Sequence, residues 1–428
     1  MAAALGVLVS CGSVKSGEEV VAASRDSKVV VAYVTSWSEV MPDPQYMTHI
    51  NYAFGHVNES FNGVKIDNEE RLRQIVDLRK QKPELKVLLS IGGWGSGRFS
   101  EMAANDEYRR AFAADCDRVV KEFALDGIDI DWEYPTSSMA NISSSPDDTE
   151  NFTLLMQDIR AAIGNEKELT LATVASARYI DFKAILPSVD FVNIMAYDMA
   201  SAPKHHSALY PSGHSGDITS DGAVTAHLKA GVPPSKLVMG MPFYGRGGDG
   251  YPSFQDYNKV GNTDTQYTEK WDEVAQVPYL ADKNDTLVFG FENPRSLAIK
   301  CQYILDKDLL GGMYWDYSGD NEQGDLRRTV AENLLGKPHK AKVLVLTERG
   351  GQHGGFTDAG LRWLAAEGVK GNFSITEINN ARNITEAYLS QFSLVIQLDF
   401  PPYTWPKEAA DAFVKYIEEG RGGWIGFH

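Results

Sequence analysis

Eight strand-like apolar runs recur along the first three quarters of the chain, and helical patterns separate most of them. The runs are 29–35, 50–55, 87–92, 127–133, 169–175, 191–197, 237–243 and 312–316. The helical patterns are 68–82, 106–124, 149–163, 221–230, 294–305 and 323–335. Strands that alternate with helices indicate a parallel sheet. Eight such repeats predict an α/β fold, a (β/α)8 TIM barrel, whose chemistry is expected at the C-terminal ends of the strands.

The fourth run, 127–133, alternates strictly between apolar and acidic residues. One face carries Ile128, Ile130 and Trp132, and the other carries Asp129, Asp131 and Glu133. Same-face neighbours on a strand lie about 6–7 Å apart, so the pKa of at least one carboxyl group is expected above its ordinary value. A solvated sheet face or a calcium site are the alternatives. We favour a proton-delivering catalytic row, because a parallel strand is covered on both faces.

Composition excludes several classes of partner. The formal net charge of −17 argues against nucleic acid and anionic membranes as partners, and it suits a neutral substrate. The three cysteines have no zinc-site spacing, and Cys116 and Cys301 are expected to be buried on outer helices. His205 and His206, with His214 nearby, are interpreted as surface or cleft-rim residues. We therefore expect no metal and no cofactor, and we expect a monomer.

The first 27 residues differ from the rest. Leu8-Val9-Ser10-Cys11 resembles the end of a bacterial lipoprotein signal, in which Cys11 would be lipidated, and the polar residues that follow are typical of a tether. A plain secretory signal or a misassigned start is the alternative. The prediction is an extracytoplasmic protein that is lipid-anchored to the bacterial cell envelope or secreted.

We divide the remainder into a barrel, 28–336, and a second unit, 340–428. In the barrel, the connection 247–290 after the seventh strand is long and shows little regular pattern, which is typical of an insertion that walls a cleft. The second unit has strands at 342–347, 374–378 and 394–398 and helices at 358–367, 385–391 and 406–419. This pattern predicts a doubly wound α/β domain, and the apolar run that opens at 423 suggests an incomplete one from a truncated gene.

Five motifs, in the order that the barrel requires, resemble glycoside hydrolase family 18, the chitinases and related endo-N-acetylglucosaminidases. They are Ser90-Ile-Gly-Gly-Trp94, Asp126-Gly-Ile-Asp-Ile-Asp-Trp-Glu133, Met195-Ala-Tyr-Asp198, Gly240-Met-Pro-Phe-Tyr-Gly-Arg246 and Gly311-Gly-Met-Tyr-Trp-Asp316. The second unit, with Glu348-Arg-Gly-Gly-Gln-His353 after its first strand, resembles a trehalose-utilisation-type (ThuA-like) domain. It contains no nucleophilic cysteine, and we expect no independent activity from it.

The resemblance implies a substrate-assisted, retaining mechanism. Glu133 would be the general acid, Asp131 would hold the acetamido group of the sugar, and Asp129 would share a proton with Asp131. Tyr197 would donate its hydroxyl to the same acetamido group. The substrate-binding positions implied are Trp315, beneath the sugar that is cleaved, and Tyr33, Phe54, Trp94, Met195, Asp198, Tyr244 and Arg246.

The predicted activity is therefore that of a chitinase cleaving β-1,4 bonds in chitin or N-acetylglucosamine-containing oligosaccharides. An endo-β-N-acetylglucosaminidase acting on N-glycans and a non-catalytic glycan-binding barrel are the alternatives. Glu133 argues against the last, because lectins of the family usually lack that acid. Trp132, on the apolar face, and Asp126, ahead of the row, are expected to be structural.

Overall fold

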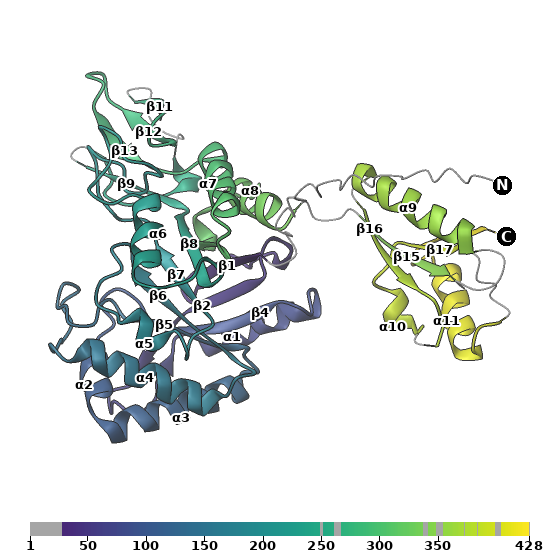
Figure 1. Cartoon of the computed structure of the whole chain (residues 1–428), viewed down its shortest axis with the longest axis horizontal. Helices are drawn as coiled ribbons and strands as arrows, with labels where there is room; N and C mark the ends of the chain where they lie inside the picture. Colours follow the sequence, from purple (N-terminus) through teal and green to yellow (C-terminus); the bar gives the residue numbers. More distant parts are fainter. Residues whose placement is uncertain are drawn as a thin grey trace, which may run out of the picture.

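The computed structural model describes residues 28–248, 251–260, 267–336, 341–347, 354–371, 373–382, 384–398 and 404–427. Cys11, the tether and His353 lie outside these residues. Eight parallel strands close into the expected barrel, with β1 pairing to both β14 and β2 (Figure 1). The strands are β1 (Val29–Thr35), β2 (His49–Val57), β4 (Lys86–Gly92), β5 (Gly127–Asp131), β6 (Glu168–Val174), β7 (Phe191–Met195), β8 (Leu237–Pro242) and β14 (Gly311–Trp315). A short strand, β3 (Val64–Ile66), forms a hairpin with β2.

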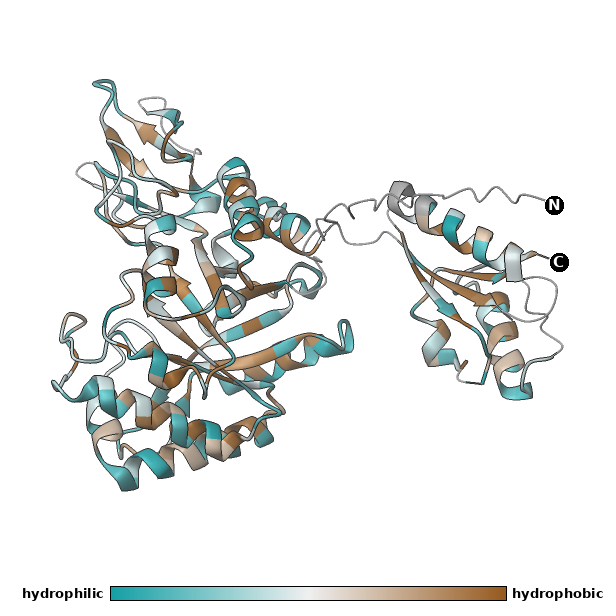
Figure 2. Cartoon of the chain, in the orientation of Figure 1, coloured by the Kyte–Doolittle hydropathy of each residue, from teal (hydrophilic) through white to brown (hydrophobic). Residues whose placement is uncertain are grey.

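Helices pack around the outside of the barrel. They are α1 (Glu69–Val76), α2 (Phe99–Ala104), α3 (Asp106–Glu122), α4 (Asp148–Ile163), α5 (Phe182–Ile185), α6 (Ser220–Lys229), α7 (Pro294–Asp306) and α8 (Asp325–Leu334). A single large apolar cluster joins them to the outward-facing strand residues. Figure 2 shows the resulting pattern, in which apolar strands lie inside helices that are hydrophilic on their outer faces. Cys116 and Cys301 are buried on α3 and α7, as predicted.

The insertion after β8 is more regular than its sequence indicates. It forms a five-stranded antiparallel sheet in the order β10-β9-β13-β12-β11. The strands are β9 (Tyr244–Gly247), β10 (Gln255–Asp256), β11 (Thr268–Asp272), β12 (Val277–Ala281) and β13 (Leu287–Gly290). The expectation of an irregular connection was wrong because these strands are short, and because the polar run of β11 hides the alternation that marks a half-buried strand.

The second unit is a parallel sheet in the order β16-β15-β17-β18. Its elements are β15 (Ala341–Thr347), α9 (Gly354–Gly371), β16 (Phe373–Ile378), α10 (Glu386–Leu389), β17 (Leu394–Leu398), α11 (Lys407–Glu418) and β18 (Gly423–Phe427). One face packs against α9, and the other against α10 and α11 (Figure 1). Helices on both faces confirm the predicted doubly wound arrangement.

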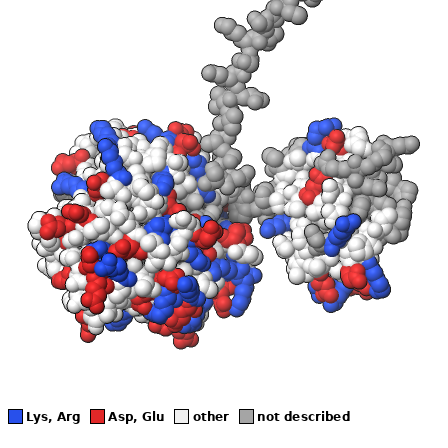
Figure 3. All heavy atoms as spheres, turned by 60° about the horizontal axis from the view of Figure 1, so that its bottom comes forward, with Lys and Arg blue, Asp and Glu red and all other residues white. Residues whose placement is uncertain are grey.

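Charge is dispersed over the surface. On the face drawn in Figure 3, acidic and basic side chains are interspersed over the barrel, and no extensive basic patch is visible there. This face therefore has no basic surface of the kind that binds nucleic acid, in keeping with the net charge of −17. Among the helices described, none combines the length and the apolar character that a bilayer crossing requires.

Candidate active site

The acidic row lies at the C-terminal end of β5. Asp129 and Asp131 point into the barrel, and β5 ends at Asp131, two residues earlier than predicted. Glu133 therefore follows the strand and stands at the barrel mouth. On the opposite face, Trp132 is buried and stacks on Phe99 with ring centroids 5.3 Å apart, so its predicted packing role is confirmed.

Asp129 is fully buried and accepts hydrogen bonds from four side chains. The Tyr33 and Ser90 hydroxyls each lie 2.8 Å from its Oδ2, and the Thr170 hydroxyl lies 2.6 Å from its Oδ1. The Asn193 amide lies 3.4 Å from Oδ1. Burial raises the pKa of Asp129, and these donors oppose the rise by stabilising the charged form. Asp129 is thus an acceptor held from four other strands.

Asp131 has the opposite environment. It is 4% exposed, and its Oδ1 has no hydrogen-bond partner among the described residues. Burial, followed by the charges of Glu133 and Asp129, raises the pKa of Asp131 well above its usual range. No hydrogen bond joins Asp131 to Asp129 in the described structure, so the shared proton stays a prediction. Asp131 lines the catalytic cavity, and a buried oxygen without a partner in the described structure calls for one, which a bound substrate can supply.

Burial raises the pKa of Glu133 to about 7, a hydrogen bond with Tyr134 opposes the rise, and the charge of Asp198 adds to it. We expected the neighbouring carboxylate of the row, Asp131, to be the main cause of the raised pKa, but desolvation is the largest cause and the charge that adds to it is that of Asp198. A carboxylic acid with such a pKa is still protonated near neutral pH and can donate its proton.

Two glycines of β4 and its loop make room for the row. A Cβ at Gly92 would lie 1.9 Å from the Asp131 carbonyl oxygen, and one at Gly93 would lie 2.7 Å from the Phe54 ring. Both residues have positive φ, at 134° and 94°. The predicted role of these glycines, backbone clearance beside the acids, is confirmed, and Ser90 serves as a donor to Asp129.

A cavity of about 600 Å³ opens above the acids. It is lined by three of the predicted catalytic residues, Asp131, Glu133 and Tyr197. All the predicted binding positions also line it, namely Tyr33, Phe54, Trp94, Met195, Asp198, Tyr244, Arg246 and Trp315. Asp129 lies behind Asp131 and does not line it. Trp315 forms an aromatic surface, stacked on Phe54 at 5.5 Å and tilted against Tyr33 at 5.6 Å. Such surfaces suit the apolar faces of sugar rings.

Asp198 and Arg246 form a clamp on the side of the cavity that faces the insertion. Arg246 binds the Asp198 carboxylate through two nitrogens, at 2.6 and 2.7 Å. These hydrogen bonds, with a contribution from His206, hold the pKa of Asp198 below its usual range despite burial. Tyr197 is half-buried next to the clamp, and its hydroxyl lies 3.7 Å from the Met313 sulfur.

Six further residues that the sequence did not single out line the cavity: Trp37, Tyr134, Met139, Phe254, and Ala172 and Val174 of β6. Trp37 follows the end of β1 by two residues, and Tyr134 follows Glu133 directly. Because residues that follow barrel strands line the active site in this fold, both could have been predicted from their positions in the sequence. Met139 and Phe254 come from connections without regular alternation, and nothing in their local sequence marks them.

The predicted surface position is right for His214, which is exposed, and wrong for the other two histidines of this loop. His205 and His206 are each 1% exposed, not at the surface. His205 lies 3.2 Å from Asp272 of β11, and burial lowers its pKa to about 4. His206 lies against Asp198. The polar loop composition suggested exposure, but the insertion sheet covers this loop. Asp126, by contrast, pairs with Arg79 and accepts from the Val87 N–H, which confirms a structural position.

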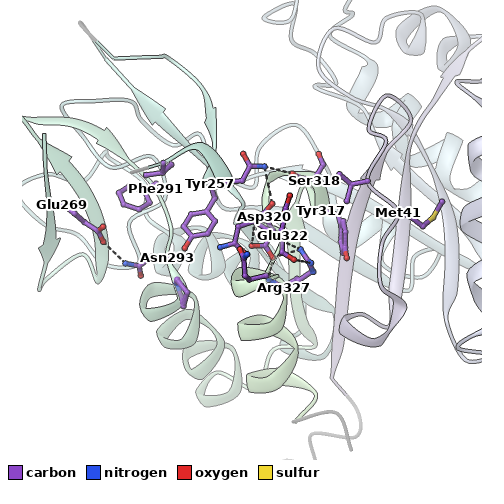
Figure 4. Close-up of a pocket in the computed structure, with 16 residues that line it drawn as sticks. Met41, Tyr257, Glu269, Phe291, Asn293, Tyr317, Ser318, Asp320, Glu322 and Arg327 are labelled. Atoms are coloured by element: carbon purple, nitrogen blue, oxygen red, sulfur yellow. Dashed lines mark hydrogen bonds and ion pairs between the residues drawn. The ribbon is translucent and has the colours of Figure 1, made fainter. Parts of the chain in front are cut away.

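A second cavity of about 940 Å³ lies between the insertion, the loop after β1, and the first turns of α7 and α8 (Figure 4). Its polar groups are largely engaged with one another. Asn258 donates to the Ser318 and Asp320 carbonyls, and Arg327 pairs with the Asp320 carboxylate at 3.2 Å. These contacts fasten the insertion to the segment after β14, and thereby hold one wall of the first cavity in place.

Fold and site together define a (β/α)8 glycosidase, with a half-buried acid of raised pKa in an aromatic cavity. The family model for glycosyl hydrolases family 18 matches residues 29–320, and the chain belongs to that family. The model for the trehalose utilisation family matches residues 342–428, as the sequence predicted for the second unit.

Named relatives agree with this assignment. Chitinase A1 of Niallia circulans is 30% identical over 71% of this chain, which spans only 58% of that protein's length. Chitotriosidase-1 of Mus musculus is 31% identical over 69% of this chain and 74% of its own. Among solved structures, a family 18 N-acetylglucosaminidase from Paenibacillus barengoltzii has a TM-score of 0.66 and 32% identity, covering 72% of this chain and 99% of that one.

Proposed function

We propose that this protein is a chitinase, which hydrolyses β-1,4 bonds between N-acetylglucosamine units. The observation that carries the proposal is the pairing of Glu133, half-buried with a pKa of about 7, with Asp131, which lines the same cavity and whose buried Oδ1 has no hydrogen-bond partner among the described residues. One group can supply a proton, and the other can accept a hydrogen bond from a substrate N–H. An N-acetylated sugar offers both the glycosidic oxygen and the amide that these groups require.

Hydrolysis would proceed with the substrate's help. Glu133 protonates the leaving glycosidic oxygen, while the acetamido oxygen of the same sugar attacks C1. Asp131 accepts the acetamido N–H and stabilises the positive charge that forms in the resulting oxazolinium ring. Water, deprotonated by Glu133, then attacks C1 and opens the ring, so that configuration at C1 is retained. Tyr197 donates to the acetamido group. Asp129, which is held by hydrogen bonds from Tyr33 and Thr170, would share a proton with Asp131 during the reaction.

Aromatic rings would hold the polymer. Trp315, stacked on Phe54, offers a platform beneath the sugar that is cleaved, and the exposed Trp37 and Trp94 extend aromatic surface beyond it. Tyr244, Arg246 and Asp198 would bind from the insertion side. All these side chains come from one chain, so the site does not require a second copy, which supports the expectation of a monomer.

A digest of chitooligosaccharides with analysis of products tests the proposal. We expect N,N′-diacetylchitobiose to accumulate from the tetramer and longer substrates. The N-acetylglucosaminidase among the similar structures favours one further candidate, release of single N-acetylglucosamine units, and monosaccharide as the first product would establish it. Inertness toward these substrates with cleavage of an N-linked glycan would establish the endo-β-N-acetylglucosaminidase alternative instead.

The pH dependence of kcat/KM should report Glu133. Its pKa of about 7 is raised from 4.5, so the protonated acid persists through weakly acidic pH and is lost as the pH rises through about 7. We expect kcat/KM to fall on the basic side with an apparent pKa near 7, measured on a soluble oligosaccharide. A flat profile between pH 5 and about 9 would contradict the assignment of Glu133 as the acid.

We further propose that the protein acts outside the cytoplasm and is anchored through lipidated Cys11. Support comes from the small apolar segment that ends at this cysteine and from the polar residues that follow it. In a bacterial host, the full chain should partition into the membrane fraction and carry an acyl mass increment at the mature N-terminus. The Cys11→Ala variant should lose both, and partitioning that survives this change would refute the anchor.

A further inference from the structure

His206 occupies a defined place below the catalytic cavity. Its Nδ1 lies 3.5 Å from Asp198 Oδ1, and its ring packs against Tyr244 with centroids 5.4 Å apart. Its side chain is fully buried. Asp198 has a left-handed backbone, with φ at 54°, a conformation that persists at a non-glycine residue where surrounding contacts hold it. His206 thus touches the one acid of the cavity that is clamped by Arg246.

The backbone around His206 is fixed from both sides. Its carbonyl accepts from the Met199 N–H at 3.0 Å, which closes the loop after β7. On the other side, the Ser207 hydroxyl donates to Glu292 at 2.6 Å, and Lys300 pairs with Glu292 and donates to the Ser207 carbonyl. Glu292 and Lys300 are both buried. A fully buried, paired network of this kind leaves the imidazole little freedom to move.

The ring nitrogens determine which tautomer the site accepts. Nδ1 lies within 3.5 Å of both the Asp198 carboxylate and the Asp198 N–H, so it could donate to the first or accept from the second. If it accepted, the ring hydrogen would sit on Nε2, which is buried and has no partner among the described residues. A buried N–H without an acceptor is costly. The geometry also lets the Asp198 N–H donate to Nδ1, but that pair is only part-buried whereas Nε2 is fully buried. The arrangement in which Nδ1 carries the hydrogen and donates it to the Asp198 carboxylate therefore costs less.

We propose that His206 is a positioning residue, whose Nδ1–H holds the Asp198 carboxylate in its clamp with Arg246 beside the catalytic acid. The proposal rests on the proposed function for its kinetic consequence only. Asp198 also faces other titratable and charged groups from the elements around it. These are Arg246 and Tyr244 on β9, Tyr197 after β7, and Glu133 and Tyr134 after β5.

The kinetic consequence follows from the charge on Asp198, which contributes to the raised pKa of Glu133. Without the donor at His206, the carboxylate is free to turn outward with Arg246, and its effect on Glu133 weakens. The pKa of Glu133 then falls, so the basic limb of the kcat/KM profile moves to lower pH. We expect a shift of roughly half a pH unit and, from the smaller protonated fraction of Glu133, about a twofold loss in kcat/KM at pH 7.

Two substitutions of His206, by Asn and by Gln, distinguish a role in positioning Asp198 from a role in packing alone. In His206→Asn the amide nitrogen lies near the place of Nδ1 and can still donate to Asp198. In His206→Gln it lies near the place of Nε2, where no described residue offers an acceptor. We expect the Asn variant to keep the basic limb of the kcat/KM profile at its wild-type pH and to keep most of kcat/KM. In the Gln variant we expect the basic limb to move to lower pH and kcat/KM to fall. Equal profiles in the two variants would overturn the proposal.

His205→Asn is the matched control, because His205 is equally buried on the same loop but faces Asp272. It should leave the basic limb in place, even if the melting temperature falls. Nitrogen-15 NMR of protein with labelled histidines reports the tautomer of His206 independently of activity. The His206 signal is the one that disappears in the His206→Asn variant. We expect the Nδ1–H tautomer, and Nε2–H would refute the proposal. If the wild type did not cleave chitooligosaccharides, the proposed function would be refuted. The NMR measurement would still decide whether His206 donates to Asp198.

Discussion

Glu133→Gln is expected to reduce kcat on chitooligosaccharides by at least about 10³-fold, because the amide keeps the shape of the side chain but has no proton to transfer at the leaving oxygen. Binding should persist, since the aromatic surface around Trp315 and Phe54 is unchanged. Steady-state kinetics and tryptophan fluorescence titration with a chitooligosaccharide measure the two effects separately. Full activity in this variant would remove Glu133 from the mechanism.

Glu150→Gln is the matched control for this change. Glu150 lies in the first turn of α4 with its side chain exposed, so the same loss of one carboxylate there should leave kcat within about twofold of the wild type. A large effect in the control would show that net charge or folding, and not the position of Glu133, governs the activity.

Much of the barrel could be predicted because the sequence patterns that mark its strands and helices are local. The eight strands of the barrel were found within about two residues of their ends, since parallel strands covered on both faces read as apolar runs between helical patterns. The insertion strands were not found, because β11 and β12 pair in a small sheet whose outer face is polar. Their order depends on contacts between segments that are far apart in sequence, and no local pattern encodes such contacts.

In the candidate site, too, some features could be predicted from local sequence and others depend on tertiary contacts. Asp129, Asp131 and Glu133 follow from alternation on one strand, which is a property of the chain alone. The burial that sets the pKa of Glu133, and the contact of His206 with Asp198, depend on which loops the fold brings over the barrel mouth. A histidine in a polar loop looks exposed from its neighbours in sequence, and only the insertion sheet that covers it reverses that expectation.

Asp131→Asn should lower kcat by about 10²–10³-fold while the protein becomes no less stable. Asn retains the volume of the side chain but provides no negative charge to stabilise the positive charge that forms on the acetamido group. Burial and the charges of Glu133 and Asp129 oppose ionisation of Asp131 in the folded state, so the wild type loses stability as the pH rises above 3.8, the ordinary pKa of the group. The neutral amide removes that loss.

Melting temperatures of the two proteins, compared from pH 4 to about 8, distinguish this cause from damage to the fold. We expect the variant to melt at or above the wild-type temperature, with a difference that grows toward high pH, because only the wild type must keep a charge from forming at a buried oxygen without a partner. A variant that retains activity within threefold of the wild type would show that the acetamido group is stabilised elsewhere. A variant that melts lower at every pH would show that Asp131 holds the barrel together, and its lost activity would then reveal nothing about charge in the transition state.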